Sequence, residues 1–199
     1  MHTLVAFTGA GISKASGIPT FEEMDIRDKL SRDYFNQHSE EFFRVLLEMK
    51  KTVDQAEPNP AHLALAHHHI PVVTMNVDGL HRRAGSQGVL EVHGNLEYVL
   101  CRKCNNKYPY EDLENSIYCH NCGEILQPNV VLYGDEIPLY FSAINLMGNA
   151  RELLVVGTSF YTSTAWDLVG RVERAGIKVT TINANAETEV PKYLNSIFG

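Results

Sequence analysis

Short apolar runs and amphipathic segments alternate along this chain. The apolar runs, at residues 4–7, 71–74, 89–92, 153–156 and 178–182, have the length and composition of buried strands. Segments with a helical pattern separate or follow them, at residues 26–51, 61–66, 137–150, 165–175 and 190–198. Strands that alternate with helices in this way predict an α/β fold, a parallel doubly wound sheet with right-handed crossovers.

Polar and glycine-rich segments follow the predicted strands directly, at residues 8–13, 75–81, 157–159 and 183–185. Open α/β sheets bind ligands just beyond the carboxyl ends of their strands, so these segments predict a ligand-binding edge. In the first of them, Gly9 and Gly11 would let the backbone approach a pyrophosphate closely, in front of a helix N-terminus. A plain tight turn is the alternative, because the third glycine of the usual dinucleotide fingerprint is missing.

Two Cys-x-x-Cys pairs, Cys101 with Cys104 and Cys119 with Cys122, contain every cysteine of the chain. Fourteen residues separate the pairs, a spacing close to that of a four-thiolate zinc site. Such a site is structural, because four thiolates leave no coordination position open. Two disulfides are the alternative, but the pair spacing and the absence of a secretory signal favour reduced thiolates on a metal.

The cysteine pairs also divide the chain. We expect residues 97–127 to form an inserted zinc-binding lobe, in which residues 98–100 and 124–126 pair as strands. Residues 1–96 and 128–199 would then form the α/β domain, with a helical insert at about residues 25–69. A metal site allows a lobe of this size to fold although its own apolar core is small.

Composition is that of an ordinary globular protein, with 44% hydrophobic and 21% charged residues among 199. The formal net charge of −7 argues against nucleic acid as a direct partner. The chain has neither a signal peptide nor an apolar run of the length that spans a membrane, so we expect a cytoplasmic protein with no membrane partner. We expect a monomer.

Several motifs occur in one order and spacing. They are Gly9-Ala-Gly-Ile-Ser13 with Ser16-Gly-Ile-Pro19, Asn76-Val-Asp-Gly-Leu-His81, Val92-His-Gly94, the two cysteine pairs, Val130-Val-Leu-Tyr-Gly-Asp135, Gly157-Thr-Ser159 and Ile182-Asn183. With them the chain resembles the sirtuins, NAD-dependent protein deacylases, over essentially its whole length. The resemblance implies a Rossmann-like large domain with a small zinc-binding lobe. It also implies that NAD and an acyl-lysine peptide enter the cleft between them from opposite sides.

The resemblance implies roles for individual residues. In NAD binding, the pyrophosphate would be lined by Gly9, Ala10, Gly11 and Ser13, and the nicotinamide by Asn76 and Asp78. The phosphate and adenosine side would be held by Gly157, Thr158, Ser159 and Asn183. The substrate backbone would lie along Val131, Tyr133 and Gly134, and Cys101, Cys104, Cys119 and Cys122 would hold one structural zinc ion. His93 would be the catalytic base. His81 and the run at residues 67–69 are expected to be structural histidines, not metal ligands.

The chemistry that the resemblance implies is transfer of the acyl group from acyl-lysine to ADP-ribose. The acyl-lysine amide oxygen attacks the ribose carbon that carries nicotinamide, and nicotinamide leaves. A histidine beside the ribose hydroxyls then removes a proton, so that the 2′-oxygen attacks the acyl carbon. His93 is the histidine that occupies this position in the motif.

Three positions depart from the family's pattern. Met75 replaces a glutamine that contacts the nicotinamide ribose, and a thioether cannot donate a hydrogen bond. Glu22 replaces a loop arginine, for which Arg27 or Arg32 is a possible substitute, and Asp135 replaces a glutamate.

These departures leave two alternatives to deacylation open. One is NAD glycohydrolase or ADP-ribosyltransferase activity in the same cleft, which shares the departure of nicotinamide but uses a different nucleophile. The other is a non-catalytic module that binds NAD or ADP-ribose, although His93 would then have no catalytic task.

Overall fold

The computed structural model describes residues 2–20, 26–159 and 163–199. Five parallel strands form the larger sheet, in the order β3-β2-β1-β7-β8. They are β1 (His2–Thr8), β2 (Val72–Thr74), β3 (Val89–Glu91), β7 (Ala150–Val156) and β8 (Lys178–Ile182). The chain builds outward from β1 in both directions, so the sheet is doubly wound as predicted, and the ends of β1 and β7 form its switch point.

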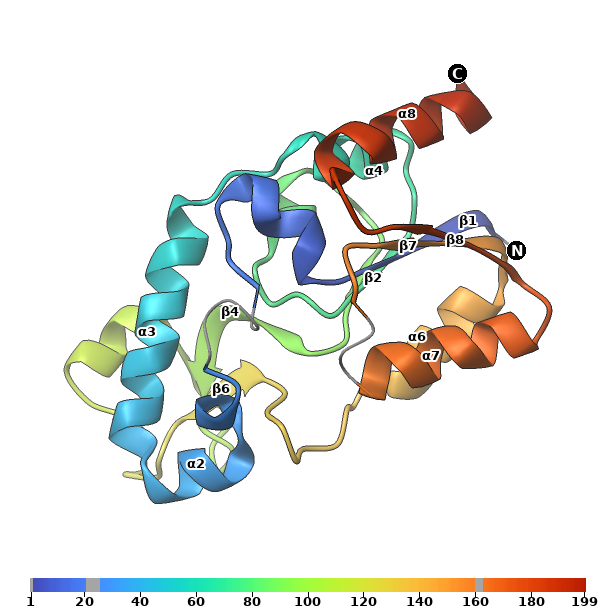
Figure 1. Ribbon diagram of the computed structural model, residues 1–199. Helices are drawn as coiled ribbons and strands as arrows, with labels where there is room; N and C mark the ends of the chain where they lie inside the picture. Colours follow the sequence, from blue (N-terminus) through green and yellow to red (C-terminus); the bar gives the residue numbers. More distant parts are fainter. Residues whose placement is uncertain (1, 21–25, 160–162) are drawn as a thin grey trace.

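Helices cover both faces of this sheet (Figure 1). α6 (Tyr140–Gly148) and α7 (Ser163–Arg174) pack on one face, against alternate β1 residues Val5 and Phe7. α4 (Pro60–His67) and α8 (Ala186–Phe198) pack on the other, against Leu4 and Ala6. Successive side chains of a strand point to opposite faces, so a strand buried on both sides reads as one continuous apolar run.

A second sheet is antiparallel, in the order β5-β4-β6, and consists of β4 (Gly94–Leu100), β5 (Lys107–Tyr108) and β6 (Gln127–Val130). The expected pairing of residues 98–100 with 124–126 is wrong, because Leu100 pairs with Gln127. Residues 123–125 are used instead to close the second cysteine turn, where Cys119 N–H donates to the Glu124 carbonyl at 2.7 Å.

The single helix expected over residues 26–51 is three separate elements. They are the 3-10 helix η2 (Asp28–Leu30), α2 (Arg32–Gln37) and α3 (Ser39–Gln55). Ser31 caps α2 by accepting a hydrogen bond from Tyr34 N–H, and His38 leaves helical geometry with φ −138°. Polar capping positions interrupt the pattern here, although apolar residues continue on both sides of them.

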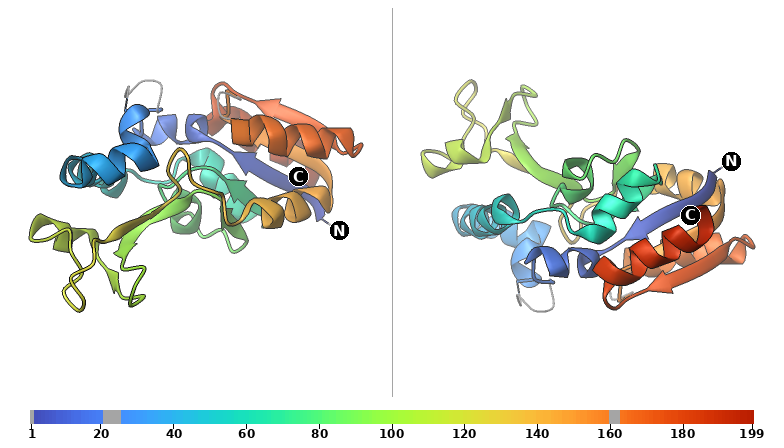
Figure 2. Two further views of the ribbon diagram at one scale, coloured as in Figure 1. Left: turned by 90° about the horizontal axis from the view of Figure 1, so that it is seen from below. Right: turned by 90° about the horizontal axis from the view of Figure 1, so that it is seen from above.

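Helices α2 and α3 share a core with the cysteine lobe. Phe42 and Leu46 pack in the same cluster as Cys101, Cys119 and Leu126. The lobe, in yellow and green, projects from one end of the molecule beside these helices (Figure 2). The remaining elements are the 3-10 helices η1 (Ala10–Ser16) and η3 (Tyr110–Glu114) and the short helix α5 (Leu80–Arg83). In the described part of the chain, no helix is long and apolar enough to cross a membrane.

Candidate active site

The turns that follow β1 and β7 pack directly on each other. Gly11 N–H donates to the Gly157 carbonyl at 2.8 Å. A Cβ atom on Gly11 would lie 2.7 Å from Gly157 Cα, and one on Gly157, whose φ is +63°, would lie 2.2 Å from Ile12 N. Both glycines are therefore required by contact between the turns, a reason that the sequence did not reveal. Gly9, Ala10, Gly11 and Gly157 form one glycine-rich surface. The helix expected after the first turn is the 3-10 helix η1, which begins at Ala10.

The end of β8 joins this surface through Asn183. Thr158 N–H donates to Asn183 Oδ1 at 3.1 Å, and Gly157 N–H donates to the Ile182 carbonyl at 2.9 Å. Beyond it lies an open depression of about 530 Å³ between residues 181–184 and α8. Three of the four predicted strand-end segments thus come together, with Ser159 next to Thr158 in the chain.

Ser13, Asn76 and Asp78 form a buried hydrogen-bonded group. Ser13 Oγ donates to Asp78 Oδ2 at 2.7 Å, and Asn76 Nδ2 donates to both Ser13 Oγ and Asp78 Oδ2, at 3.1 and 3.2 Å. Burial raises the pKa of Asp78, although hydrogen bonds from Leu80 N–H, Ser13 and Asn76 oppose the shift. The group offers fixed carboxylate and amide acceptors and donors at the carboxyl end of β2.

Two buried histidines that the sequence did not place in the site lie nearby, one in contact with this group and one in contact with Thr8. His62 Nε2 lies 3.5 Å from Ser13 Oγ, and His81 Nε2 lies 2.9 Å from Thr8 Oγ1. Burial lowers the pKa of His62 to about 4 and that of His81 well below its usual value, so both rings are neutral at pH 7. The sequence offered one signal that His62 has a structural role: it lies three residues after Asn59, and the two side chains form a capping box at the start of α4.

His93 lies in the turn between β3 and β4 and is half-buried. Its Nδ1 is 3.1 Å from the Met75 carbonyl oxygen. A carbonyl only accepts, so Nδ1 carries the proton and Nε2 is left as a basic atom. Burial lowers the pKa of His93, although the hydrogen bond to the Met75 carbonyl opposes the shift. The lowered pKa keeps the ring neutral at pH 7. The bond uses the main chain of Met75, so replacement of glutamine by methionine leaves it intact.

The Met75 side chain is buried in the core under the sheet edge and approaches the first glycine turn. Its Cε would lie 3.3 Å from a Cβ atom on Gly9. The sequence departure at position 75 therefore places a thioether against the glycine surface.

The segment expected to take the substrate backbone is already held at two points. Val131 N–H donates to the His93 carbonyl at 2.9 Å. Tyr133 pairs through both its main-chain groups with residues 30–32: its N–H donates to the Leu30 carbonyl at 3.0 Å, and its carbonyl accepts from Arg32 N–H at 2.9 Å. Within the described ranges, no hydrogen bond engages the main chain of Gly134, where φ is +96°.

Both candidate replacements for the missing loop arginine already have partners elsewhere. Arg32 donates to both carboxylate oxygens of Asp135 and to Gln127 Oε1, each at 2.8 Å. The Arg27 guanidinium lies over the Tyr133 ring, 4.9 Å from its centre. Glu22 itself lies outside the described residues.

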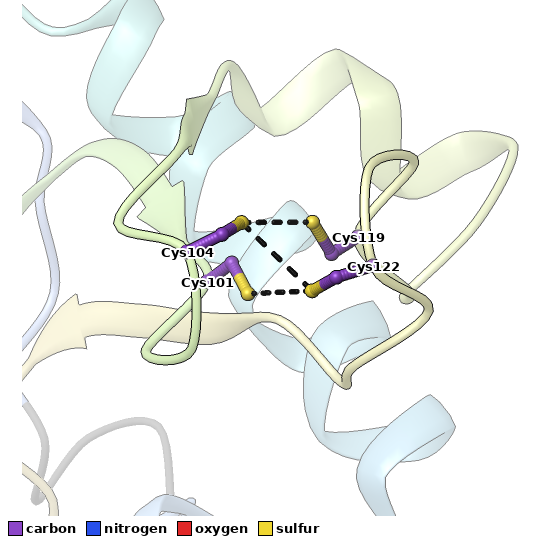
Figure 3. Close-up of side chains that lie close together, drawn as sticks. All are labelled: Cys101, Cys104, Cys119 and Cys122. Atoms are coloured by element: carbon purple, nitrogen blue, oxygen red, sulfur yellow. Dashed lines mark hydrogen bonds between the residues drawn. The ribbon is translucent and has the colours of Figure 1, made fainter.

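The four cysteine sulfur atoms lie within 4.8 Å of one another (Figure 3). Three of their separations are 3.4, 3.5 and 3.8 Å, too long for a disulfide and close to the ~3.8 Å edge of a zinc–thiolate tetrahedron. Both turns close in the same way, with a residue of positive φ, Asn105 or Gly123, after the second cysteine.

The Tyr108 hydroxyl, 3.0 Å from Cys119 Sγ, is the main cause that lowers the pKa of that thiol to about 6. The donor set fits a structural zinc ion, and among the described residues no other group fits a metal.

A protein-family model described as the Sir2 family matches residues 9–163. The chain belongs to the Sir2 family. Among its relatives, an NAD-dependent protein deacetylase of Thermotoga maritima is 38% identical over 90% of this chain and 80% of its own length.

Solved structures agree with this assignment. A Sir2 homologue in complex with NAD superposes with a TM-score of 0.88 at 29% identity, covering 98% of this Sir2-family chain and 88% of the homologue. Sir2Tm bound to a propionylated peptide superposes with a TM-score of 0.84 at 33% identity, covering 98% and 91%. The sirtuin resemblance drawn from the motifs is therefore confirmed.

Proposed function

We propose that this Sir2-family chain is an NAD-dependent protein-lysine deacylase. It transfers the acyl group of an acyl-lysine side chain to ADP-ribose and releases nicotinamide. The observation that carries the proposal is the arrangement of His93, whose Nδ1 is fixed by the Met75 carbonyl so that Nε2 is the basic atom. A neutral imidazole in a half-buried turn is the group needed to take a proton from a ribose hydroxyl.

The glycine surface and the buried polar group divide the cofactor between them. Gly9, Ala10, Gly11, Gly157, Thr158, Ser159 and Asn183 hold the phosphates and the adenosine side, where close backbone approach suits a pyrophosphate. Ser13, Asn76 and Asp78 hold the nicotinamide end, where the Asp78 carboxylate accepts from the carboxamide. NAD supplies the labile bond between nicotinamide and ribose. The Sir2 homologue solved in complex with NAD supports NAD as the ligand.

The acyl-lysine peptide lies along Val131, Tyr133 and Gly134. Since the main chain of Tyr133 is paired with residues 30–32, the peptide is left with the Val131 carbonyl and the Gly134 main chain as its backbone partners. Main-chain bonds carry little sequence information, which favours a site that accepts many sequences. The propionylated peptide bound to Sir2Tm supports an acyl-lysine ligand.

The zinc ion is structural. Cys101, Cys104, Cys119 and Cys122 would hold it, and four thiolate ligands would leave no coordination position for water or substrate. Four unoxidised thiols in one metal site are typical of a reducing compartment, which supports a cytoplasmic location. The proposal also includes a monomeric protein and a zinc-binding lobe that extends from residue 97 to residue 127.

The test is to incubate the purified chain with NAD and acetyl-, propionyl- and longer acyl-lysine peptides and to analyse the products by mass spectrometry. Deacylation predicts nicotinamide, free lysine peptide and O-acyl-ADP-ribose in equal amounts. His93→Ala should abolish the acyl product and retain NAD binding. NAD consumption that is equal with and without peptide would establish a glycohydrolase instead, and NAD binding without any product would establish a binding module.

A further inference from the structure

Four polar side chains form a hydrogen-bonded series around the turn that carries His93. Arg82 Nε lies 3.1 Å from Glu91 Oε1, Asn95 Nδ2 donates to Glu91 Oε2 at 2.8 Å, and Asn129 Nδ2 donates to Asn95 Oδ1 at 2.8 Å. Arg82 lies in α5, Glu91 ends β3, Asn95 is near the start of β4, and Asn129 lies in β6. The series therefore joins four elements that meet at the proposed site.

The central pair of this series is buried. Glu91 is 6% exposed and Asn95 is 8% exposed. A buried carboxylate is stable only when it is paired and hydrogen-bonded, and bonds to a charged acceptor are stronger than neutral ones. The Glu91–Asn95 bond is therefore a strong local constraint, unlike an ion pair at the surface.

This bond spans residues 91–95, and His93 is the middle residue of that segment. The main chain around it is fixed on both sides, because Val92 N–H donates to the Thr74 carbonyl at 2.9 Å and Val131 N–H donates to the His93 carbonyl at 2.9 Å. Gly94 packs so closely on β6 that a Cβ atom there would lie 2.1 Å from the Asn129 carbonyl oxygen. Asn129 thus contacts the turn with its main chain and holds Asn95 with its side chain.

We propose that Glu91 and Asn95 are positioning residues for His93. Their hydrogen bond, anchored by Arg82 on one side and Asn129 on the other, fixes the turn so that Nε2 of His93 faces the ribose hydroxyls. The inference rests on the proposed deacylase function and adds two residues that touch neither substrate. It concerns the step in which His93 removes a proton, after nicotinamide has left.

An isosteric exchange tests this pair. In Glu91→Gln, one amide must present its donor to Arg82 or to Asn95. Asn95 can accept it only by turning its own amide, which breaks the bonds that its Oδ1 accepts from Asn129 Nδ2 and from Glu97 N–H. In Asn95→Asp, two carboxylates face each other in a buried site. In the double variant all three contacts can re-form. The new amide at position 91 accepts from Arg82 through its oxygen and donates through its nitrogen to the new carboxylate at position 95, which also accepts from Asn129.

We expect each single variant to lower the rate of O-acyl-ADP-ribose formation by roughly ten- to a hundredfold, because a turn displaced by about 1 Å misaligns the base. The KM for NAD should change by less than about threefold, and nicotinamide release should be less affected than acyl transfer. The reason is that NAD binding and the departure of nicotinamide both precede the removal of the proton by His93. The double variant should recover to within about threefold of the wild-type kcat.

A matched control is Glu152→Gln. Glu152 is also a poorly exposed carboxylate, paired with Lys178 and Thr180. It lies near the amino-terminal end of β7, away from the carboxyl ends of the strands where the proposed site lies. This variant should lower the melting temperature and leave kcat unchanged.

The outcomes separate the two hypotheses. Single variants with wild-type kcat, or a double variant as slow as the singles, would overturn the positioning role. A fall in kcat that only accompanies a fall in melting temperature, and that Glu152→Gln reproduces, would do the same. If the wild-type chain forms no O-acyl-ADP-ribose, the proposed function fails first and the positioning role falls with it.

Discussion

Arg32 and Asp135 form a two-point ion pair across 103 positions of the chain, with Nε to Oδ1 and Nη2 to Oδ2 both at 2.8 Å. Asp135 Oδ2 also accepts from Leu132 N–H at 3.1 Å, which closes the turn over residues 132–135. Burial raises the pKa of Asp135, but the bonds from Arg32 and Leu132 outweigh it and hold the pKa below its usual value. The pair thus joins the start of α2 to the proposed substrate edge.

Substitution Arg32→Ala should raise the KM for an acyl-lysine peptide by about tenfold, because the turn at residues 132–135 loses its partner and Asp135 keeps only one strong bond. The KM for NAD should stay within about twofold of the wild type. Arg32→Lys should give an intermediate value, since an ammonium cannot make the two parallel bonds. Steady-state kinetics with each substrate varied measures this, and Arg44→Ala, an exposed pair with Glu40, is the control.

Equal rises in both KM values for Arg32→Ala would contradict this role, because they would indicate a change that is not confined to the peptide site. An unchanged peptide KM would show that the turn keeps its shape without the ion pair.

Substitution Gly157→Ala should destabilise the fold far more than its positive φ alone predicts. The conformation costs a non-glycine residue about 1–2 kcal/mol, and the new Cβ would in addition lie 2.2 Å from Ile12 N. Gly176→Ala is a matched control, because Gly176 has φ +85° and no atom within 4 Å of the added Cβ. Urea unfolding should show a difference of at least about 2 kcal/mol between the variants. Equal losses would mean that the two turns separate at little cost.

Folding stability should fall as the pH is lowered from about 6.5 to about 4, in part because of His62. Its pKa is about 4 in the folded chain, so over this range the unfolded state binds a proton that the native state does not. Stability then rises with pH across the window and is fully present above 6.5; the slope is about 1.4 kcal/mol per pH unit for one such group. His81, whose pKa is also lowered, adds to the slope. Urea unfolding at several pH values measures it, and His62→Gln should reduce it. An unchanged slope in that variant would rule out His62 as a contributor.

Removal of zinc should loosen the helices α2 and α3 as well as the cysteine lobe. Phe42 and Leu46 of α3 lie in one core with Cys101 and Cys119, so the lobe cannot unfold without exposing them. Metal analysis should find about one zinc per chain. After chelation, hydrogen exchange should accelerate over residues 28–55 and 96–126 and stay slow in β1 and β7. Uniform acceleration along the chain would show instead that the two cores unfold together.

Local chemistry in the sequence was sufficient for the strands of the larger sheet and for the cysteine cluster. The apolar run at residues 4–7 predicted a buried strand, and β1 packs Leu4 and Ala6 on one side and Val5 and Phe7 on the other. Cysteine spacing likewise predicted the sulfur cluster, because two knuckles of fixed geometry bring four thiols together. The prediction of a single helix over residues 26–51 was wrong, because the break at Ser31 depends on a capping hydrogen bond that hydrophobic periodicity does not reveal.

The sequence by itself determined which residues end strands, and hence that Gly9, Asn76 and Gly157 lie at one edge. Only the tertiary structure decided what those residues contact: Gly11 against Gly157, His62 behind Ser13, and Asn95 against Glu91. The physical reason is the distance along the chain over which each effect acts. Propensity, periodicity and motif spacing report on neighbours in the chain, whereas packing of two turns and pairing of buried polar groups depend on how distant segments meet.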